Sequence, residues 1–210
     1  MNITIIGSGN MGSGFVKQLS AAGHRVTVTG RDMAKAAALA KQYERAQAVE
    51  PAQAARNADV IVVATPYEAA AAALRSLGDL NGKVVLDITN PLTADYMGLT
   101  LGHQTSAAEE IARAVPGTDV VKGFNTLFAQ VLSEGASFGG GQKVTVFLAS
   151  DSDRAKQTVR ALAESLGFQT MDAGGLKNAR YLEPLAALNI YFGYGAGLGT
   201  GIAPTWIRKA

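Results

Sequence analysis

The chain has 210 residues, of which 48 % are hydrophobic and 17 % charged, and its formal net charge is +2. It contains no cysteine, which excludes disulfides, thiolate metal sites and a cysteine nucleophile. No Lys/Arg-dense stretch indicates a nucleic-acid partner, and no apolar run approaches the roughly 20 residues of a membrane span. The composition therefore predicts a cytoplasmic α/β protein with small-molecule ligands, no signal peptide, and no nucleic acid or membrane as partner.

Short β-branched runs alternate with alanine-rich helical patterns, which predicts a parallel sheet with crossover helices. The expected strands are residues 2–7, 25–29, 60–64, 83–87, 120–124, 143–148 and 169–172. The expected helices are residues 11–22, 33–43, 68–76, 106–115 and 153–166. We expect a Rossmann-type, doubly wound fold, with residues 1–148 as the dinucleotide-binding core and residues 149–210 as a C-terminal elaboration of the same compact unit.

The stretch "IIGSGNMGSG" contains G-x-G-x-x-G at Gly7, Gly9 and Gly12, directly after a strand and at the start of a helix. Gly7 suits the tight turn, Gly9 lets the backbone approach a pyrophosphate, and Gly12 lets the helix pack closely on the strand. The N–H groups at the helix start then face the phosphates. A plain strand–helix turn would not need a glycine inside the helix, so we predict a dinucleotide site.

The end of the second strand decides between NAD and NADP, because an NAD enzyme places a carboxylate there for the ribose. Thr29 and Gly30 are followed by Arg31, whose guanidinium can clamp a 2′-phosphate, and Lys35 adds a second positive charge. Asp32 could be mistaken for the ribose acid, but it also fits the N-cap of the next helix. We therefore predict NADP(H).

The chain offers no evident acid–base machinery. It has no HExxH, no GxSxG and no acidic cluster with metal spacing, so we expect no metal. His24 is expected at the surface and His103 in a solvated loop. About sixty residues follow Leu148, too few for the helical domain of the β-hydroxyacid dehydrogenases. One chemistry needs no catalytic side chain: hydride transfer between two cofactors, in which the protein stacks one ring on the other.

At this point the chain resembles the F420-dependent NADP oxidoreductases (deazaflavin reductases), and it is similar to the cytosolic NADPH domain of the six-transmembrane metalloreductases. The stretches that carry the resemblance are "IIGSGNMGSG", "ATPYEA", "DITNPL", "TSAAEEIARAVPGTDVVKGFNTLFA" and "DAGGLKNARYLEPLAALNI". The last two are the most specific, because many families share the glycine motif. The resemblance implies an NADP-dependent oxidoreductase that exchanges hydride with a deazaflavin.

By position, the resemblance also implies site residues. Ser8, Gly9, Asn10 and Met11 fall on the NADP pyrophosphate; Gly30, Arg31 and Lys35 on the 2′-phosphate; Thr65, Pro66, Asn90 and Pro91 near the nicotinamide ribose; and Ala129 close to the nicotinamide. Asn125, Thr126 and Leu127 back the paired rings. The chain departs from the family pattern at Asn125 and Ala186, which leaves the second cofactor open between coenzyme F420 and a flavin.

Three functions stay open from the sequence. The first is hydride transfer from NADPH to a deazaflavin. The second is an NADPH reductase that passes electrons through a flavin to ferric iron or another acceptor. The third is a non-catalytic module that senses NADP(H).

The C-terminal stretch raises three expectations. Residues 182–206, rich in glycine and aromatic side chains such as Tyr191, predict a homodimer interface. Arg180 and Glu183 stand one turn apart, so we expect them to pair on a helix surface. Between Gly193 and Gly201 glycine alternates with larger residues, which predicts an extended segment with one bare edge.

Overall fold

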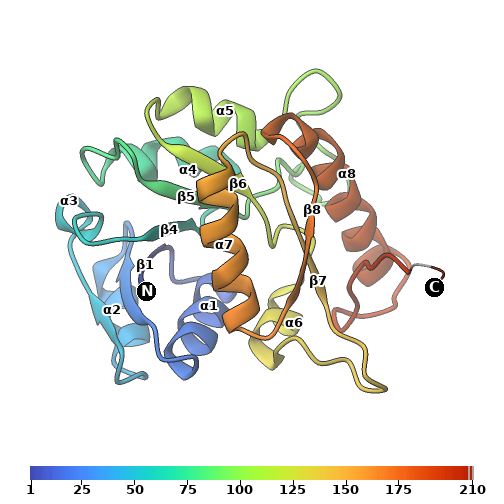
Figure 1. Cartoon of the computed structure of the whole chain (residues 1–210), viewed down its shortest axis with the longest axis horizontal. Coiled ribbons are helices and arrows are strands. Elements are labelled where there is room, and N and C mark those ends of the chain that lie inside the picture. The colour runs from blue at the N-terminus through green and yellow to red at the C-terminus, as the bar shows by residue number, and fades with distance from the viewer. Residues whose placement is uncertain (208, 210) are drawn as a thin grey trace.

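The structure, a computed structural model, describes residues 1–207 and 209 (Figure 1). Six parallel strands form one sheet in the order β3–β2–β1–β4–β5–β6. They are β1 (Asn2–Ile6), β2 (Arg25–Thr29), β3 (Ala46–Ala48), β4 (Val60–Val63), β5 (Val84–Asp87) and β6 (Asp119–Lys122). The strand order reverses between β1 and β4, as in Rossmann folds, which confirms the predicted fold class.

Helices lie on both faces of this sheet, as is usual for an all-parallel sheet. One face packs against α1 (Asn10–Ala21), α2 (Met33–Ala40), α6 (Ala129–Glu134) and α7 (Asp153–Ser165). The other packs against α3 (Pro51–Ala54), α4 (Tyr67–Arg75) and α5 (Ala107–Ala114). The central strand β4 reads Val-Ile-Val-Val and is buried throughout, because each of its faces lies under helices.

The C-terminal part adds a second, smaller sheet. β7 (Thr145–Leu148) pairs in parallel with β8 (Gln169–Asp172), and an antiparallel bridge between Lys122 and Ala149 joins the chain after β7 to the end of β6. The boundary predicted after residue 148 therefore falls between two paired strands. The chain ends with a 3₁₀ turn (Leu176–Asn178), α8 (Ala179–Ile190) and the π-helix η2 (Tyr191–Gly195). α8 lies on the opposite side of the molecule from α2 and α3 (Figure 1).

Two possible features are absent from the residues that the structure describes. None of their helices combines the length and the apolar character that crossing a membrane would require. Nor do these residues bring together three or more His, Cys, Asp or Glu side chains that could hold a metal ion.

The fold contradicts the expectations for His24 and for the segment from Gly193. His24 is buried, with 8 % of its surface exposed, because Nδ1 lies 3.1 Å from the N-terminal amino group and Nε2 lies 2.8 Å from the Ser165 hydroxyl at the end of α7. Burial, and then the charge of the amino terminus, lower the pKa of His24. The segment from Gly193 is not extended at its start, since η2 continues α8 as far as Gly195.

Candidate functional site

The carboxyl ends of β1, β4 and β5 open into a hollow of about 760 Å³, called here the larger hollow. Ligands of doubly wound folds bind at this edge of the sheet, where the strand order reverses. Residues predicted from the sequence that line it are Gly9, Asn10, Met11, Thr65, Pro66 and Asn90. They come from the glycine loop and from the chain after β4 and β5.

Each glycine of the loop has a distinct environment. Gly7 has a φ of +114°, and a Cβ there would lie 2.4 Å from the carbonyl oxygen of Ala64. A Cβ on Gly12 would lie 2.1 Å from the carbonyl oxygen of Gly7, so α1 packs directly on the loop. Around Gly9, in contrast, a Cβ would meet no atom within 4 Å. Gly7 and Gly12 are therefore needed for folding, and Gly9 leaves open space beside the larger hollow.

The start of α1 suits an anion. Gly9 is its N-cap and makes no side-chain hydrogen bond, and the first turn contains no acidic residue. The first N–H groups of a helix lack partners inside the helix and lie at the positive end of its dipole. A phosphate group bound at this point would accept hydrogen bonds from these N–H groups and would be stabilised by the positive end of the dipole.

The chain after β2 carries the charged residues Arg31, Asp32 and Lys35. Arg31 is exposed and forms no ion pair with another described residue. Asp32 caps α2: its Oδ1 accepts from the Lys35 backbone N–H at 3.0 Å, and its Oδ2 lies 3.6 Å from the Lys35 ammonium. The backbone hydrogen bond is the main cause that lowers the pKa of Asp32. Asp32 is therefore the N-cap of α2, the role that its position in the sequence also fits.

Two polar groups of the larger hollow were missed by sequence reasoning. The Thr89 hydroxyl is buried and has no hydrogen-bond partner among the described residues. Tyr67 begins α4; burial raises the pKa of its phenol, and the carboxylates of Glu110 and Glu183 raise it further, so the hydroxyl stays protonated at neutral pH. Tyr67 lies in the stretch "ATPYEA" and Thr89 in "DITNPL", but only the fold shows that both line the larger hollow.

A second hollow of about 190 Å³, called the smaller hollow, adjoins the first. Predicted residues that line it are Met11, Asn90, Asn125, Thr126, Leu127 and Ala129. Ala186, Asn189 and Ile190 of α8 and Tyr194 of η2 close its other side. Three residues line both hollows: Met11, Asn90 and Tyr96. These three mark the place where two ligands would meet.

Tyr96 is the one of these three that the sequence did not single out. It lies in the loop after β5, which is closed by a bridge between Leu92 and Leu99 and by the Thr93 N–H, which donates to the Gly98 carbonyl at 2.9 Å. Its φ is +62°, a left-handed conformation that is uncommon outside glycine, and its side chain is 62 % exposed. Strained backbone of this kind clusters at functional sites.

The wall formed by Asn125 and Thr126 is held from several elements. Asn90 Nδ2 donates to the Asn125 carbonyl at 2.8 Å, and Asn125 Nδ2 donates to Asn90 Oδ1 and to the Leu182 carbonyl of α8, both at 3.0 Å. Asn189, also on α8, donates to the Thr126 carbonyl at 3.1 Å. The loop after β5, the loop after β6 and α8 are thus joined by amide hydrogen bonds.

A buried ionic cluster lies behind this wall. The Lys122 ammonium lies 2.9 Å from Asp87 Oδ2 and 2.9 Å from Glu183 Oε1, and it also donates to the Thr89 carbonyl. The Glu183 carboxylate accepts in addition from the N–H groups of Ala107 and Ala108 at the start of α5. Burial alone would lower the pKa of Lys122, but the carboxylates of Asp87 and Glu183 outweigh it and the pKa is raised, so the lysine is charged.

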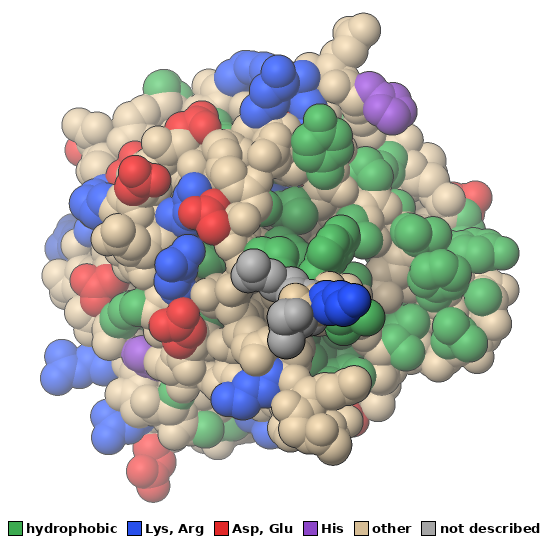
Figure 2. Space-filling view, turned by 45° about the vertical axis from the view of Figure 1, so that its right-hand side comes forward, with side chains coloured by type: hydrophobic (Ala, Val, Ile, Leu, Met, Phe, Trp, Pro, Cys, Tyr) green, Lys and Arg blue, Asp and Glu red, His purple; other side chains and the backbone are tan. Residues whose placement is uncertain are grey.

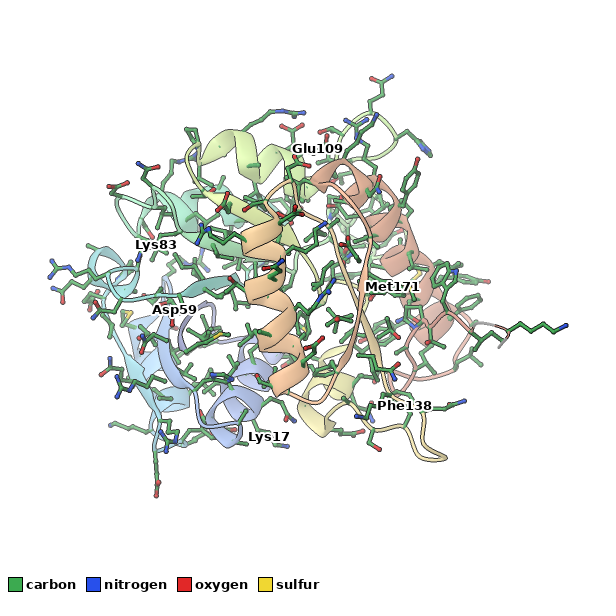
Figure 3. All side chains as sticks on the ribbon, in the orientation of Figure 1. Lys17, Asp59, Lys83, Glu109, Phe138 and Met171 are labelled. Atoms are coloured by element: carbon green, nitrogen blue, oxygen red, sulfur yellow. The ribbon has the colours of Figure 1, made fainter. Side chains whose placement is uncertain are left out.

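The expected surface pair of Arg180 with Glu183 is therefore wrong. Glu183 points into the protein, and the Arg180 guanidinium binds both carboxylate oxygens of Glu109 at 2.8 and 2.7 Å. Figure 3 shows Glu109 beside the start of α8. The hydrogen bonds from Arg180 are the main cause that lowers the pKa of Glu109. Two charged pairs thus fix α8 to α5 and β6, although Pro184 interrupts its backbone hydrogen bonding.

Several predicted residues line neither hollow. Gly7, Ser8 and Gly12 shape the loop. Thr29 ends β2, Gly30 and Arg31 follow it, and Lys35 lies in α2. The Gly7 N–H donates to the Thr29 carbonyl at 2.8 Å, which ties the end of β2 to the glycine loop. Pro91 is buried, and its carbonyl accepts from the Thr100 N–H at 2.7 Å.

Comparison with known proteins shows the family to which the chain belongs. Residues 2–91 match the family described as NADP oxidoreductase coenzyme F420-dependent. An F420-dependent NADP reductase of Methanothermobacter marburgensis is 32 % identical over 207 residues, covering 90 % of this chain and 91 % of that protein. The chain belongs to this family. The resemblance seen in the sequence is confirmed, and the family is one of NADP oxidoreductases, the class of enzyme that was predicted.

Two further comparisons extend this finding. The chain is 33 % identical over 184 residues to the metalloreductase STEAP3 of Rattus norvegicus, which covers 87 % of this chain but only 36 % of that protein. The crystal structure of a candidate F420-dependent NADP reductase from Arthrobacter sp. FB24 superposes with a TM-score of 0.86 at 28 % identity, covering 98 % of this chain and 99 % of that one. The Arthrobacter protein thus shares almost the whole fold with this chain, whereas this chain spans only about a third of the metalloreductase.

Proposed function

We propose that the protein transfers hydride between NADP(H), bound along the glycine loop, and a deazaflavin of the coenzyme F420 type in the smaller hollow. The observation that carries the proposal is the junction of the two hollows at Met11, Asn90 and Tyr96. A pocket that only senses a nucleotide has no need of a second hollow at this point. The F420-dependent relatives support the same choice of acceptor.

The residues present fit NADP(H). The open space at Gly9, the uncapped start of α1 and the unpartnered Thr89 hydroxyl all face or adjoin the larger hollow. Arg31 carries a free positive charge where a 2′-phosphate is expected, and Asp32 is engaged in capping α2. When bound, the nicotinamide supplies the hydride and the deazaflavin accepts it.

The protein's own contribution is to position the rings and to exclude water. Leu127, Phe128 and Ala129 give the smaller hollow an apolar side, and Asn90 and Asn125 give it polar groups at one edge. No carboxylate, lysine, arginine or histidine among the described residues lines it. The transfer therefore depends on geometry rather than on acid–base groups, and its rate should vary little across neutral pH.

Anaerobic incubation with NADPH and a panel of acceptors tests the proposal, with absorbance at 340 nm as the readout. We expect oxidation of NADPH with coenzyme F420, and transfer of deuterium from stereospecifically labelled NADPH into the reduced deazaflavin. Leu127→Ala, which alters the shape of the smaller hollow, should slow the reaction. Turnover with a flavin or a ferric chelate, but not with F420, would instead establish the metalloreductase-like function that the STEAP3 relative suggests. Binding of NADPH without turnover of any acceptor would establish a sensor.

We further propose that the protein works as a homodimer in the cytoplasm. Hydrophobic side chains gather on the face carried by α8 and the C-terminal segment (Figure 2). They include Leu188, Tyr191, Tyr194, Leu198 and Trp206, each at least 49 % exposed. Apolar patches of this kind mark interfaces, and the absence of cysteine suits a reducing compartment. A monomeric mass by light scattering at micromolar concentration would disprove the dimer.

A further inference from the structure

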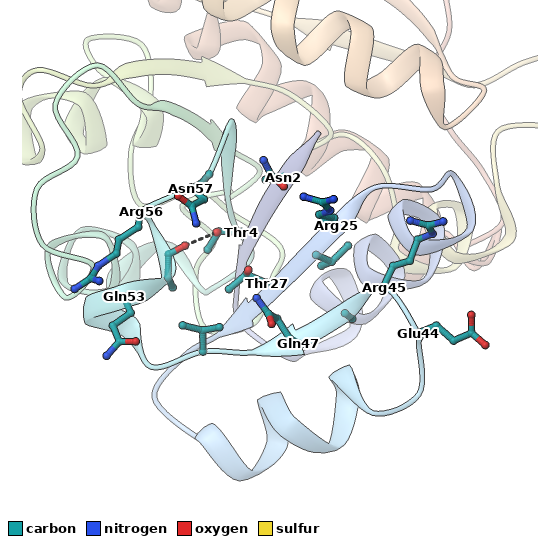
Figure 4. Close-up of a pocket in the computed structure, with 15 residues that line it drawn as sticks. Asn2, Thr4, Arg25, Thr27, Glu44, Arg45, Gln47, Gln53, Arg56 and Asn57 are labelled. Atoms are coloured by element: carbon teal, nitrogen blue, oxygen red, sulfur yellow. Dashed lines mark hydrogen bonds between the residues drawn. The ribbon is translucent and has the colours of Figure 1, made fainter.

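A third hollow, of about 630 Å³, lies over the starts of β1, β2 and β3 (Figure 4). We call it the arginine hollow, after Arg25, Arg45 and Arg56, which line it. It shares no lining residue with the larger or the smaller hollow. Those two open at the carboxyl ends of the strands, so the arginine hollow is a separate place in the fold.

The floor of the arginine hollow is a part of the sheet that no long helix covers. Thr4 of β1 pairs with Thr27 of β2, and Thr27 pairs with Gln47 of β3, which sets these three side chains in one row across the strands. The Thr4 hydroxyl donates to the Ala54 carbonyl at 2.7 Å, so the four-residue helix α3 covers the Thr4 end of the row (Figure 4). Thr27 is half-buried and Gln47 is exposed. Because parallel sheets are normally covered on both faces, this polar opening is unusual.

The sequence of β2 also indicates that one face of the sheet is polar here. It reads Arg-Val-Thr-Val-Thr, and its burial alternates over the first four residues, whereas β4 is apolar and buried throughout. Val26 and Val28 enter the core on one face, and Arg25 and Thr27 face the hollow on the other. Alternation of this kind marks a strand with one polar face.

The charge of the hollow is uncompensated. Its lining contains three arginines and one acidic residue, Glu44. None of the three guanidinium groups forms an ion pair with any of the residues described. Figure 4 shows Arg25 and Arg45 on one side of the hollow, Arg56 on the other, and the Thr27 and Gln47 side chains between them.

We infer that the arginine hollow binds a small, multiply charged anion that carries clustered phosphate or carboxylate oxygens. Arginine recognises both groups through paired N–H donors, and Arg25 and Arg45 together can hold one such end group. The Thr27 hydroxyl and the Gln47 amide offer hydrogen bonds to the middle of the ligand. The volume lies within the range of small-molecule sites, about 300–1,000 Å³. This inference does not depend on the proposed hydride transfer.

The test uses the full chain saturated with NADPH, so that the glycine loop is occupied, at low ionic strength. Pyrophosphate and citrate are titrated separately and followed by amide chemical shifts. We expect saturable binding of at least one of them, with chemical-shift changes concentrated in β2, β3 and α3. Tighter binding of pyrophosphate would indicate a phosphate ligand, and tighter binding of citrate a carboxylate ligand. Arg25→Ala/Arg45→Ala should weaken that binding by at least about tenfold, the scale of lost charge-assisted hydrogen bonds.

The matched control is Arg75→Ala/Lys177→Ala, which removes the same charge from exposed positions outside the hollow. It should leave the affinity within about twofold of that of the unchanged protein. Equal weakening by both double variants would show attraction to the overall charge and would overturn the inference. Absence of saturable binding of either anion would overturn it as well.

Discussion

The Lys122 ammonium lies 2.9 Å from a carboxylate oxygen of Glu183, and both side chains are almost completely buried. This contact joins β6 to α8 behind the wall of the smaller hollow. Asp87 and the start of α5 complete the cluster. A buried charge is stable only while its partners remain, so this ion pair is one of the contacts on which the position of α8 depends.

Glu183→Leu should therefore be strongly destabilising. It leaves Lys122 with one carboxylate and removes the acceptor for the N–H groups of Ala107 and Ala108. We expect a loss of about 3–5 kcal/mol in the free energy of unfolding, measured with urea. Glu183→Gln keeps an acceptor oxygen and should lose less. Tyr181→Ala, at a position on the same helix that is 74 % exposed, is the control and should stay within about 0.5 kcal/mol. Equal urea midpoints of unfolding for Glu183→Leu and the unchanged protein would contradict this prediction.

The glycine loop allows folding and binding to be separated. Gly12→Ala would bring a methyl group against the Gly7 carbonyl, so it should lower the thermal midpoint. Gly9→Ala meets no protein atom and should fold normally, but its methyl group stands where the pyrophosphate is expected. We expect its NADPH affinity to fall by at least about tenfold, or about 1.4 kcal/mol, in a fluorescence titration. Unchanged affinity in Gly9→Ala would place the nucleotide elsewhere.

Arg31 should determine the preference for NADP(H). Arg31→Ala removes a charge-assisted hydrogen bond and should weaken NADPH binding by about 1.5–3 kcal/mol, while NADH binding stays nearly unchanged. Lys41→Ala, just after α2, removes a charge outside the predicted site and serves as the control. Equal affinities of the unchanged protein for NADH and NADPH would refute the assignment.

Tyr96 should act on the acceptor more than on the nucleotide. Because it stands where the two hollows meet, Tyr96→Ala should lower kcat/KM for the acceptor by about tenfold, the effect of a misplaced ring on near-attack geometry. Tyr96→Phe keeps the ring and should retain most activity. Tyr181→Ala, another exposed tyrosine, should have no effect. The idea fails if Tyr96→Ala and Tyr181→Ala give the same kinetics.

The pair of Glu109 with Arg180 predicts a dependence of stability on pH. The pKa of Glu109 is lowered in the folded protein, so its contribution is complete above the unfolded value of about 4.3 and is lost as the pH falls through the folded value. Glu109→Gln should thus be less stable than the unchanged protein at pH 7. The difference between their free energies of unfolding should disappear in strongly acidic buffer. Urea midpoints at several pH values measure this, and a constant difference would contradict it.

The sequence was sufficient for the parts of the site that are contiguous in the chain. The glycine loop, the chain after β2 and the strands of the sheet each carry a local pattern, such as the uninterrupted apolar run of β4. The short elements β3, α3 and α6 were not predicted, because three to six residues give little periodicity.

Groups that meet only through the fold could not be predicted. Asp87, Lys122 and Glu183 come from three distant segments, and each alone resembles a solvated charge. The spacing of Arg180 and Glu183 indicated a surface pair, but Arg180 instead binds Glu109 on another helix. The prediction for His24 was wrong for the same reason, since its partner Ser165 lies 141 residues later in the chain.

The proline inside α8 has a consequence for the order in which the protein folds. A proline in a helix interior costs about 3 kcal/mol, so the sequence of α8 does not sustain the helix by itself. The groups that hold it are supplied from outside, by Lys122, Asn125 and the start of α5. α8 should therefore become helical only after β5, β6 and α5 are in place. We therefore expect the nucleotide half of the site to form before the acceptor half.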